Sequence, residues 1–226
     1  MDDRVIILAS NSPRRLQLLS LGGWKFQIWP ASIDESRLPG EAPEQYGLRV
    51  AEAKARAVIA SDGSAFPANG LVLAADTIVI DGDELLGKPA GQADAGRMLR
   101  QLRGKPHRVC TALVLISVDN GRVVRDLCMT RVPMRNYSDE EISAYVASGD
   151  PLDKAGAYAI QHLGFHPVNN LMGCYASVMG LPLCHLVRAL RQFDVAPQID
   201  VPKACQAELD YDCPVFAAVL RGEQVG

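Results

Sequence analysis

The chain has 226 residues, and because 48% of them are hydrophobic, a wholly disordered protein is excluded. Lysine and arginine number 23 against 26 aspartates and glutamates. The net charge of −3 therefore disfavours a general binder of nucleic acids or anionic membranes. No run approaches the ~18 apolar residues that cross a bilayer. The six cysteines form no CxxC pair, which predicts reduced thiols in a cytoplasmic protein.

Strands and helices are predicted to alternate along the chain. We expect a strand at 5–9, a helix that begins at Ser12-Pro13 and ends at Gly22-Gly23, a strand at 24–29 and a helix at 43–60. A strand at 71–80 that turns back at 81–83, a helix at 93–102 and a hairpin of strands 109–118 and 122–132 should follow. The last predicted elements are a helix from the Ser138 capping box to 147, a loop- and strand-like segment at 150–180 and a helix at 182–193. This order predicts an α/β fold with a mixed sheet and flanking helices. We expect one domain at 1–194, followed by a C-terminal extension at 195–226 that is either a short helix or a docked tail.

Two arginines, Arg14 and Arg15, fall in the first turn of the first predicted helix. Cations oppose the helix dipole there, at a cost of about 0.3–1 kcal/mol each when exposed. Free backbone N–H groups and two guanidinium groups after a strand would suit an anion. The alternative is a solvated pair of surface arginines.

Asp76 stands inside the apolar run 71–80. A buried carboxylate is costly unless it is paired, hydrogen-bonded or bound to metal. Asp76 is therefore a candidate general base or metal ligand, the alternative being a structural aspartate bonded to a nearby loop.

Other patterns are weaker. Residues 82–88 fit GxxxxGK, but a proline follows Lys88 and the context is a hairpin, so we reject a phosphate-binding loop. Asp153 and Lys154 are a structural pair or part of a site, and Gln161 could read a base edge through its amide. Lys54 lies in a charged helical run that is typical of a solvated face.

Together these features resemble the Maf family of nucleoside triphosphate pyrophosphatases. The resemblance covers residues 4 to about 193 in the order of the family. It rests on LASNSPRR at 8–15, Asp34-Glu35, EAKARA at 52–57, AADTIV at 74–79, GKP at 87–89, DKAGAYAIQ at 153–161 and GLP at 180–182.

The resemblance implies an elongated α/β fold with a central cleft, similar to inosine triphosphate pyrophosphatases. It implies hydrolysis of a nucleoside triphosphate to monophosphate and pyrophosphate with Mg²⁺ or Mn²⁺. Asp76 would then activate water, and Glu35, together with Asp76, would hold the metal. The residues implied to bind the triphosphate are Ser10, Arg15, Lys54 and Lys88.

Three further positions, Arg14, Thr77 and Gln161, match those that separate the substrate branches of the family. They resemble the branch that acts on dTTP and UTP. His162 and Cys174 depart from the family pattern, and we expect both near the base pocket. The alternatives are a 7-methyl-GTP pyrophosphatase and a nucleotide-binding regulator of septum formation with little catalysis. A homodimer is a possible assembly, and we expect neither a nucleic-acid polymer nor a membrane as a partner.

Overall fold

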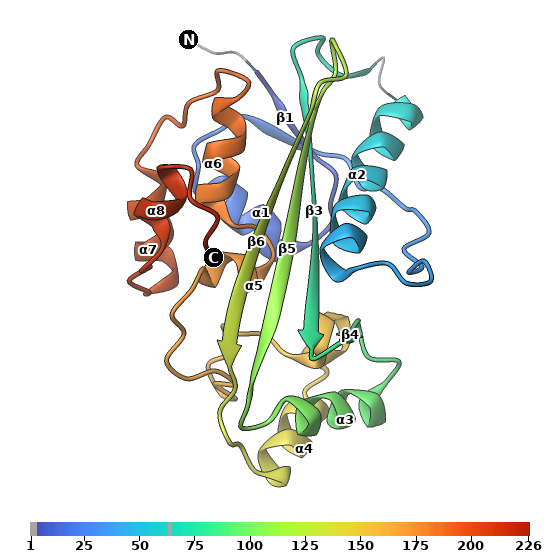
Figure 1. Cartoon of the computed structure of the whole chain (residues 1–226), viewed down its shortest axis with the longest axis vertical. Coiled ribbons are helices and arrows are strands. Elements are labelled where there is room, and N and C mark those ends of the chain that lie inside the picture. The colour runs from blue at the N-terminus through green and yellow to red at the C-terminus, as the bar shows by residue number, and fades with distance from the viewer. Residues whose placement is uncertain (1–3, 63–64) are drawn as a thin grey trace.

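The computed structural model describes residues 4–62 and 65–226 (Figure 1). The strands are β1 (Ile6–Leu8), β2 (Phe26–Ile28), β3 (Leu71–Asp81), β4 (Glu84–Leu86), β5 (Pro106–Ser117) and β6 (Val123–Pro133). The α-helices are α1 (Pro13–Ser20), α2 (Pro43–Asp62), α3 (Gln92–Leu102), α4 (Asp139–Ala147), α5 (Tyr175–Met179), α6 (Leu183–Arg191), α7 (Val201–Leu209) and α8 (Phe216–Leu220). Two short 3₁₀ helices, η2 (Asp150–Asp153) and η3 (Ala155–Ala157), follow α4.

The strands form one mixed sheet, as the sequence predicts, in the order β2-β1-β3-β5-β6. Strand β1 runs parallel to β2 and β3, whereas β5 runs antiparallel to both β3 and β6. The predicted hairpins are confirmed, with β4 folding back on β3 and β6 on β5. The predicted helices also form, including the capping box at Ser138.

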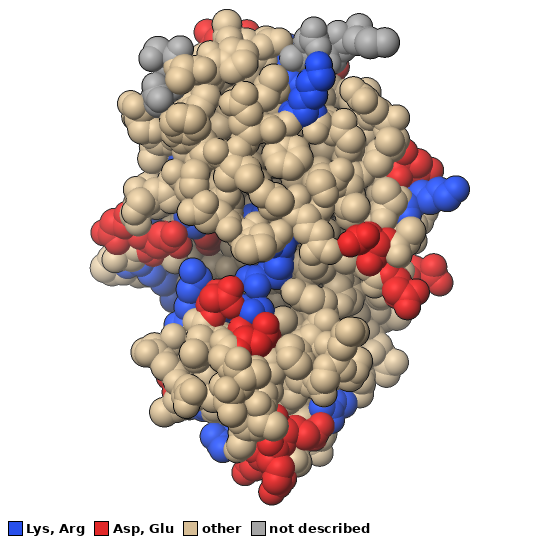
Figure 2. All heavy atoms as spheres, turned by 180° about the vertical axis from the view of Figure 1, so that it is seen from behind, with Lys and Arg blue, Asp and Glu red and all other residues tan. Residues whose placement is uncertain are grey.

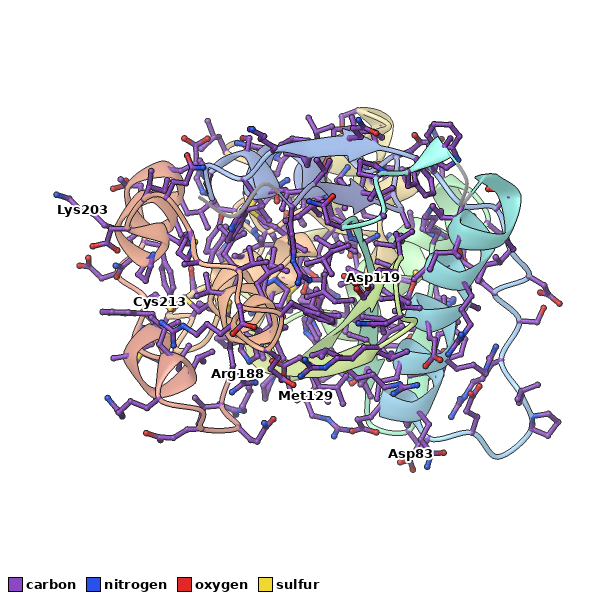
Figure 3. The ribbon with its side chains drawn as sticks, turned by 90° about the horizontal axis from the view of Figure 1, so that it is seen from above. Asp83, Asp119, Met129, Arg188, Lys203 and Cys213 are labelled. Carbon is purple, nitrogen blue, oxygen red and sulfur yellow. The ribbon has the colours of Figure 1, made fainter. Side chains whose placement is uncertain are left out.

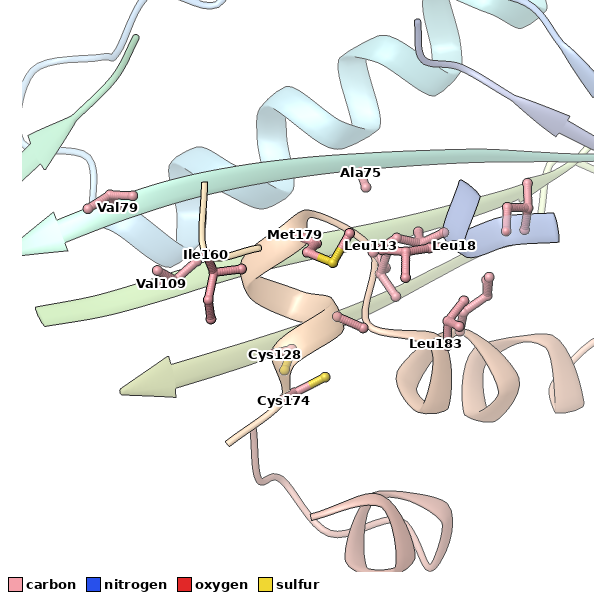
Figure 4. Packing of buried hydrophobic residues seen from close by; sticks show 14 of the residues in the cluster. Leu18, Ala75, Val79, Val109, Leu113, Cys128, Ile160, Cys174, Met179 and Leu183 are labelled. Carbon is pink, nitrogen blue, oxygen red and sulfur yellow. The ribbon is translucent and has the colours of Figure 1, made fainter. Parts of the chain in front are cut away.

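Helices cover both faces of the sheet (Figure 1). Helix α2 packs its buried Ala51 and Ala55 against Ile7 of β1 and Val72 of β3. On the other face, α1, α5 and α6 share a core with β3, β5 and β6. Figure 4 shows Leu18, Met179 and Leu183 of these helices converging on Leu113 of β5. Helices α3 and α4 cover the far ends of the long strands (Figure 1).

One edge of β3 is interrupted. Strand β5 pairs with the other edge along 71–80, so β1 and β4 must share the remaining one. Strand β1 pairs there with 71–73 and β4 with 79–81, which leaves 74–78 unpaired between them.

The strand-like prediction for 150–180 is wrong. The segment contains η2, η3 and α5, and Val168 forms an isolated bridge with Met134. Its small residues serve close packing instead of a strand. Gly156 has a φ of 68°, and a Cβ there would lie 3.0 Å from the side chain of Val79 on β3. A larger residue at this position would push the segment away from the sheet.

The residues beyond 194 form α7 and α8, which dock beside α6 (Figure 1). Arg191 of α6 donates to the Leu220 carbonyl at 3.0 Å, and Arg188 donates to the Glu223 carbonyl at 2.6 Å. Val201 is fully buried in the main core. Both expectations for the segment, a helix and a docked tail, therefore describe part of it, while the boundary at 194 stays a prediction.

All six cysteines are free thiols, as expected. Among the described residues, no helix combines the length and the apolar character needed to span a bilayer.

Acid is expected to destabilise the fold through His107 on β5. Burial lowers the pKa of this imidazole to about 4 from 6.5, outweighing the nearby Asp81 carboxylate. Below pH 6.5 the unfolded chain therefore binds a proton at this residue and the folded chain does not. The free energy of unfolding should decrease as the pH is lowered from about 6.5 to about 4. Between pH 7 and pH 5 the loss from this group should be about 2 kcal/mol. Urea unfolding at both pH values should show a smaller loss for His107→Gln, and an equal loss would contradict this assignment.

Candidate active site

A cleft of about 890 Å³ opens at the gap in the β3 edge. The nine residues that the sequence makes candidates for catalysis, metal binding or substrate binding all line this cleft, although they come from distant parts of the chain. They are Ser10, Arg14, Arg15, Glu35, Lys54, Asp76, Thr77, Lys88 and Gln161. Figure 2 shows basic side chains inside a hollow across the middle of the molecule, with acidic side chains at its rim.

Arg15 is held rigidly against the sheet. Ser12 caps α1 and accepts from the Arg15 backbone N–H, which places this side chain in the first turn. Its guanidinium donates to Ser10 Oγ at 3.2 Å, to Thr77 Oγ1 at 3.2 Å and to the Gly180 carbonyl at 2.9 Å. Burial lowers the pKa of Arg15, and the Asp76 charge opposes that shift. Three of its five N–H donors are thus engaged, and two remain for a ligand.

The guanidinium groups of Arg14 and Arg15 have different partners in the structure. Arg14 lies 3.7 Å from the Asp153 carboxylate, whereas Arg15 bonds to Ser10, Thr77 and Gly180. Asp153 also contacts Lys154 at 2.7 Å, so the structural pair suggested by the sequence exists at the rim of the cleft. Arg14 therefore lines the cleft beside an acidic partner that an entering phosphate would displace or share.

The carboxylate in the apolar strand is paired with a buried ammonium. Lys54 Nζ lies 2.8 Å from Asp76 Oδ1 and 3.0 Å from Glu35 Oε1. The side chains of Lys54 and Asp76 are only 11% and 9% exposed, whereas that of Glu35 is 51% exposed. The sequence pattern typical of a solvated face is therefore misleading for Lys54, because α2 turns this residue towards the sheet.

The loop that carries Glu35 is fastened to α2. Tyr46 donates its hydroxyl to the Glu35 carbonyl at 2.9 Å. Arg49 donates to both carboxylate oxygens of Glu41 and to the Ser36 carbonyl. Burial raises the pKa of Tyr46, reinforced by the charges of Asp76 and Glu35. Tyr46 also lines the cleft, and sequence reasoning missed it because an aromatic residue on a helix is usually core.

Two cleft residues keep their polar groups unpaired. In the part of the chain that the structure describes, Lys88 forms no ion pair and the Gln161 amide no hydrogen bond. Lys88 is exposed and follows β4. It is the last residue of the GxxxxGK pattern that we rejected as a phosphate-binding loop, and its side chain nevertheless lines the cleft. Gln161 is half-buried and lines the same cleft.

The donor set fits a hard divalent cation. Glu35 and Asp76 both reach the same ammonium, so their oxygens are close to one another. Mg²⁺ is usually bound by one or two carboxylates together with substrate phosphates. The described residues contain no cluster of three or more potential metal ligands.

Neither His162 nor Cys174 lines the cleft, although His162 directly follows Gln161, which does. The expectation that both lie near the base pocket stays a prediction. His162 Nδ1 accepts from the Phe165 backbone N–H at 2.9 Å. Cys174 is buried in the core, where Figure 4 shows it near Cys128 of β6.

Comparison with known proteins gives the family of the chain. A family model described as Maf-like protein matches residues 5–193. The chain belongs to the Maf family. A dTTP/UTP pyrophosphatase of Geotalea uraniireducens is 46% identical to this Maf chain over 83% of its length and 94% of the relative. A dTTP/UTP pyrophosphatase of Dehalococcoides mccartyi strain BAV1 is 43% identical over 86% of the chain and 84% of the relative.

Solved structures give a looser likeness to this Maf chain. A dITP/XTP pyrophosphatase of Mycobacterium abscessus overlaps 84% of the chain and 94% of its own length, with a TM-score of 0.41 and 15% identity. The Staphylococcus aureus Ham1 protein overlaps 91% and 98% with a TM-score of 0.44 and 12% identity.

Proposed function

We propose that this Maf protein hydrolyses dTTP and UTP to the nucleoside monophosphate and pyrophosphate, removing them from the nucleotide pool. The observation that carries the proposal is the Asp76–Lys54–Glu35 cluster inside a cleft lined by further cations. The names of relatives at 43–46% identity support the choice of substrate.

The charges of the cleft suit a triphosphate. Lys88 and the two unused N–H groups of Arg15 offer donors to phosphate oxygens, which are acceptors. Arg14 adds a further cation at the rim. The negative charge of Asp76 would repel the phosphates of such a ligand. A protein that only binds nucleotide has no need of this carboxylate, whereas an enzyme can use it as a base.

In this proposal Asp76 accepts a proton from water. The water oxygen would bond to the α-phosphorus, and the bond from that phosphorus to the bridging oxygen of the pyrophosphate would break. Lys54 balances the charge of Asp76 and holds its carboxylate in one orientation. Glu35 and Asp76 would hold Mg²⁺ or Mn²⁺, which supplies charge neutralisation to the phosphates when bound.

The test is pyrophosphate release from UTP, dTTP, CTP and 7-methyl-GTP with Mg²⁺ or Mn²⁺. We expect turnover of UTP and dTTP that is lost when the metal is chelated. In ¹⁸O-labelled water, attack at the α-phosphorus places the label on the monophosphate and not on pyrophosphate.

Three results would overturn the proposal. Turnover confined to 7-methyl-GTP would make the substrate assignment wrong. Label in the pyrophosphate would place the attack on the β-phosphorus. Triphosphate binding without release from any nucleotide would indicate a binding protein.

A further inference from the structure

Helix α2 contacts Glu35 at both ends of that residue. The Tyr46 hydroxyl donates to the main-chain carbonyl of Glu35 at 2.9 Å. The Lys54 ammonium lies 3.0 Å from the carboxylate of the same glutamate. Positions 46 and 54 are two steps of four residues apart, so they fall on one face of the helix. Both residues line the cleft, and this face of α2 therefore meets the cleft.

The loop that carries Glu35 relies on side chains of α2 for its position. Residues 31–38 form neither a helix nor a strand, and the Glu35 side chain is half-exposed. Arg49 donates to the Ser36 carbonyl at 2.9 Å, and its guanidinium lies over the Tyr46 ring, 5.6 Å from the ring centre. This cation–π contact supports the ring in the place from which the Tyr46 hydroxyl reaches the loop.

A divalent cation would disturb one of the two contacts to Glu35 and spare the other. In the proposed function the metal binds the carboxylates of Glu35 and Asp76, and the Lys54 ammonium lies within 3.0 Å of both. Like charges repel, so the attraction between Lys54 and Glu35 weakens when the metal arrives. The Tyr46 hydrogen bond ends on an uncharged carbonyl that is no metal ligand in this proposal, and it persists.

We infer that Tyr46 is a positioning residue for metal binding, whose hydroxyl keeps Glu35 beside Asp76 when a divalent cation binds. Hydrogen bonds behind metal ligands fix their orientation, and losing one typically weakens metal binding about 10- to 100-fold. A loop that is already fixed also avoids the entropy cost of ordering at the moment of binding. The inference rests on the proposed function, because it concerns the metal of that reaction.

The experiment is a titration with Mn²⁺, followed by the EPR signal of the free ion, with and without α,β-methylene-UTP. It compares wild type with Tyr46→Phe, which keeps the ring over which Arg49 lies and removes only the hydroxyl. We expect the affinity for Mn²⁺ to fall about 10-fold. Thermal melts check that the variant is folded.

Tyr211 provides a matched control. Its hydroxyl also bonds to main-chain carbonyls, those of Leu171 at 3.0 Å and Gly173 at 2.9 Å, but it does not line the cleft. Tyr211→Phe therefore loses the same kind of hydrogen bond far from Glu35. Its affinity for Mn²⁺ should equal that of wild type.

Two further readouts separate positioning from a general disturbance of the fold. In Tyr46→Phe the Mg²⁺ concentration for half-maximal pyrophosphate release should rise about 10-fold, whereas kcat at saturating Mg²⁺ should stay within about 3-fold of wild type. The second readout is a double-mutant cycle with Glu35→Ala. If the hydroxyl acts through Glu35, adding Tyr46→Phe to Glu35→Ala should weaken Mn²⁺ binding by less than about 2-fold.

Three results would overturn the inference. Tyr46→Phe could bind Mn²⁺ as tightly as wild type while Glu35→Ala binds it more weakly. The effects of the two substitutions could add in full. Glu35→Ala could leave Mn²⁺ binding unchanged, in which case Glu35 is no ligand. Failure of the proposed function looks different, because wild type then releases no pyrophosphate from UTP or dTTP, and the Mn²⁺ titrations still decide the role of Tyr46.

Discussion

Replacing Asp76 by asparagine should lower kcat for pyrophosphate release from UTP at least ~10²-fold, because the amide cannot take a proton from water. The amide is close in shape to the carboxylate, and it removes a negative charge from the cleft. Binding of α,β-methylene-UTP should therefore persist or tighten. Measuring kcat by pyrophosphate release and affinity by calorimetry separates the two effects.

A matched control lies on the same strand. Asp81 closes β3, pairs with Lys105 at 2.8 Å and does not line the cleft. Asp81→Asn should therefore keep kcat within about 2-fold while losing an aspartate–lysine pair of the same length whose lysine is 46% exposed. Thermal melts of both variants show how much stability each substitution costs. In Asp76→Asn the Lys54 ammonium keeps Glu35 as its ion-pair partner. A kcat for Asp76→Asn within 10-fold of wild type would remove Asp76 from the role of general base.

The second large effect concerns stability. Arg188 of α6 forms a fork with both carboxylate oxygens of Asp126 on β6, at 2.9 and 2.5 Å. The two side chains are 13% and 9% exposed, and Figure 3 labels the position of Arg188. Arg188→Met should lower the free energy of unfolding by about 3 kcal/mol, because Asp126 is left as a buried charge without its cation.

Two further variants isolate that cause. Arg221→Met breaks an exposed pair with Glu223 in the same C-terminal region and should cost at most about 0.5 kcal/mol. Adding Asp126→Leu to Arg188→Met should recover most of the loss, since no buried charge then remains. Urea unfolding measures all of these, and a cost for Arg188→Met as small as that for Arg221→Met would refute the argument. Pyrophosphate release should stay unchanged because Arg188 does not line the cleft.

Local chemistry in the sequence predicted the strands and helices that have strong signals of their own. The Ser138 capping box, the Asp119-Asn120-Gly121 turn and the Ser12-Pro13 helix start each specify a backbone conformation over a few residues. The segment 150–180 was mispredicted because its small residues are there for close approach to β3, and that requirement comes from the partner strand.

The candidate site could be predicted where a residue contradicts its surroundings. Asp76 in an apolar strand and Arg15 at a helix N-terminus both carry a cost that a function would explain.

Sequence by itself determined the mixed α/β class, the family resemblance and nine candidates for the site, because residue types and short-range order decide these. Tertiary structure alone decided how those side chains meet. It turned Lys54 inward between two carboxylates, sent Arg14 and Arg15 to different partners, and left 74–78 of β3 unpaired between β1 and β4. These arrangements depend on contacts between segments up to 165 residues apart, as between Arg15 and Gly180, which no local pattern encodes.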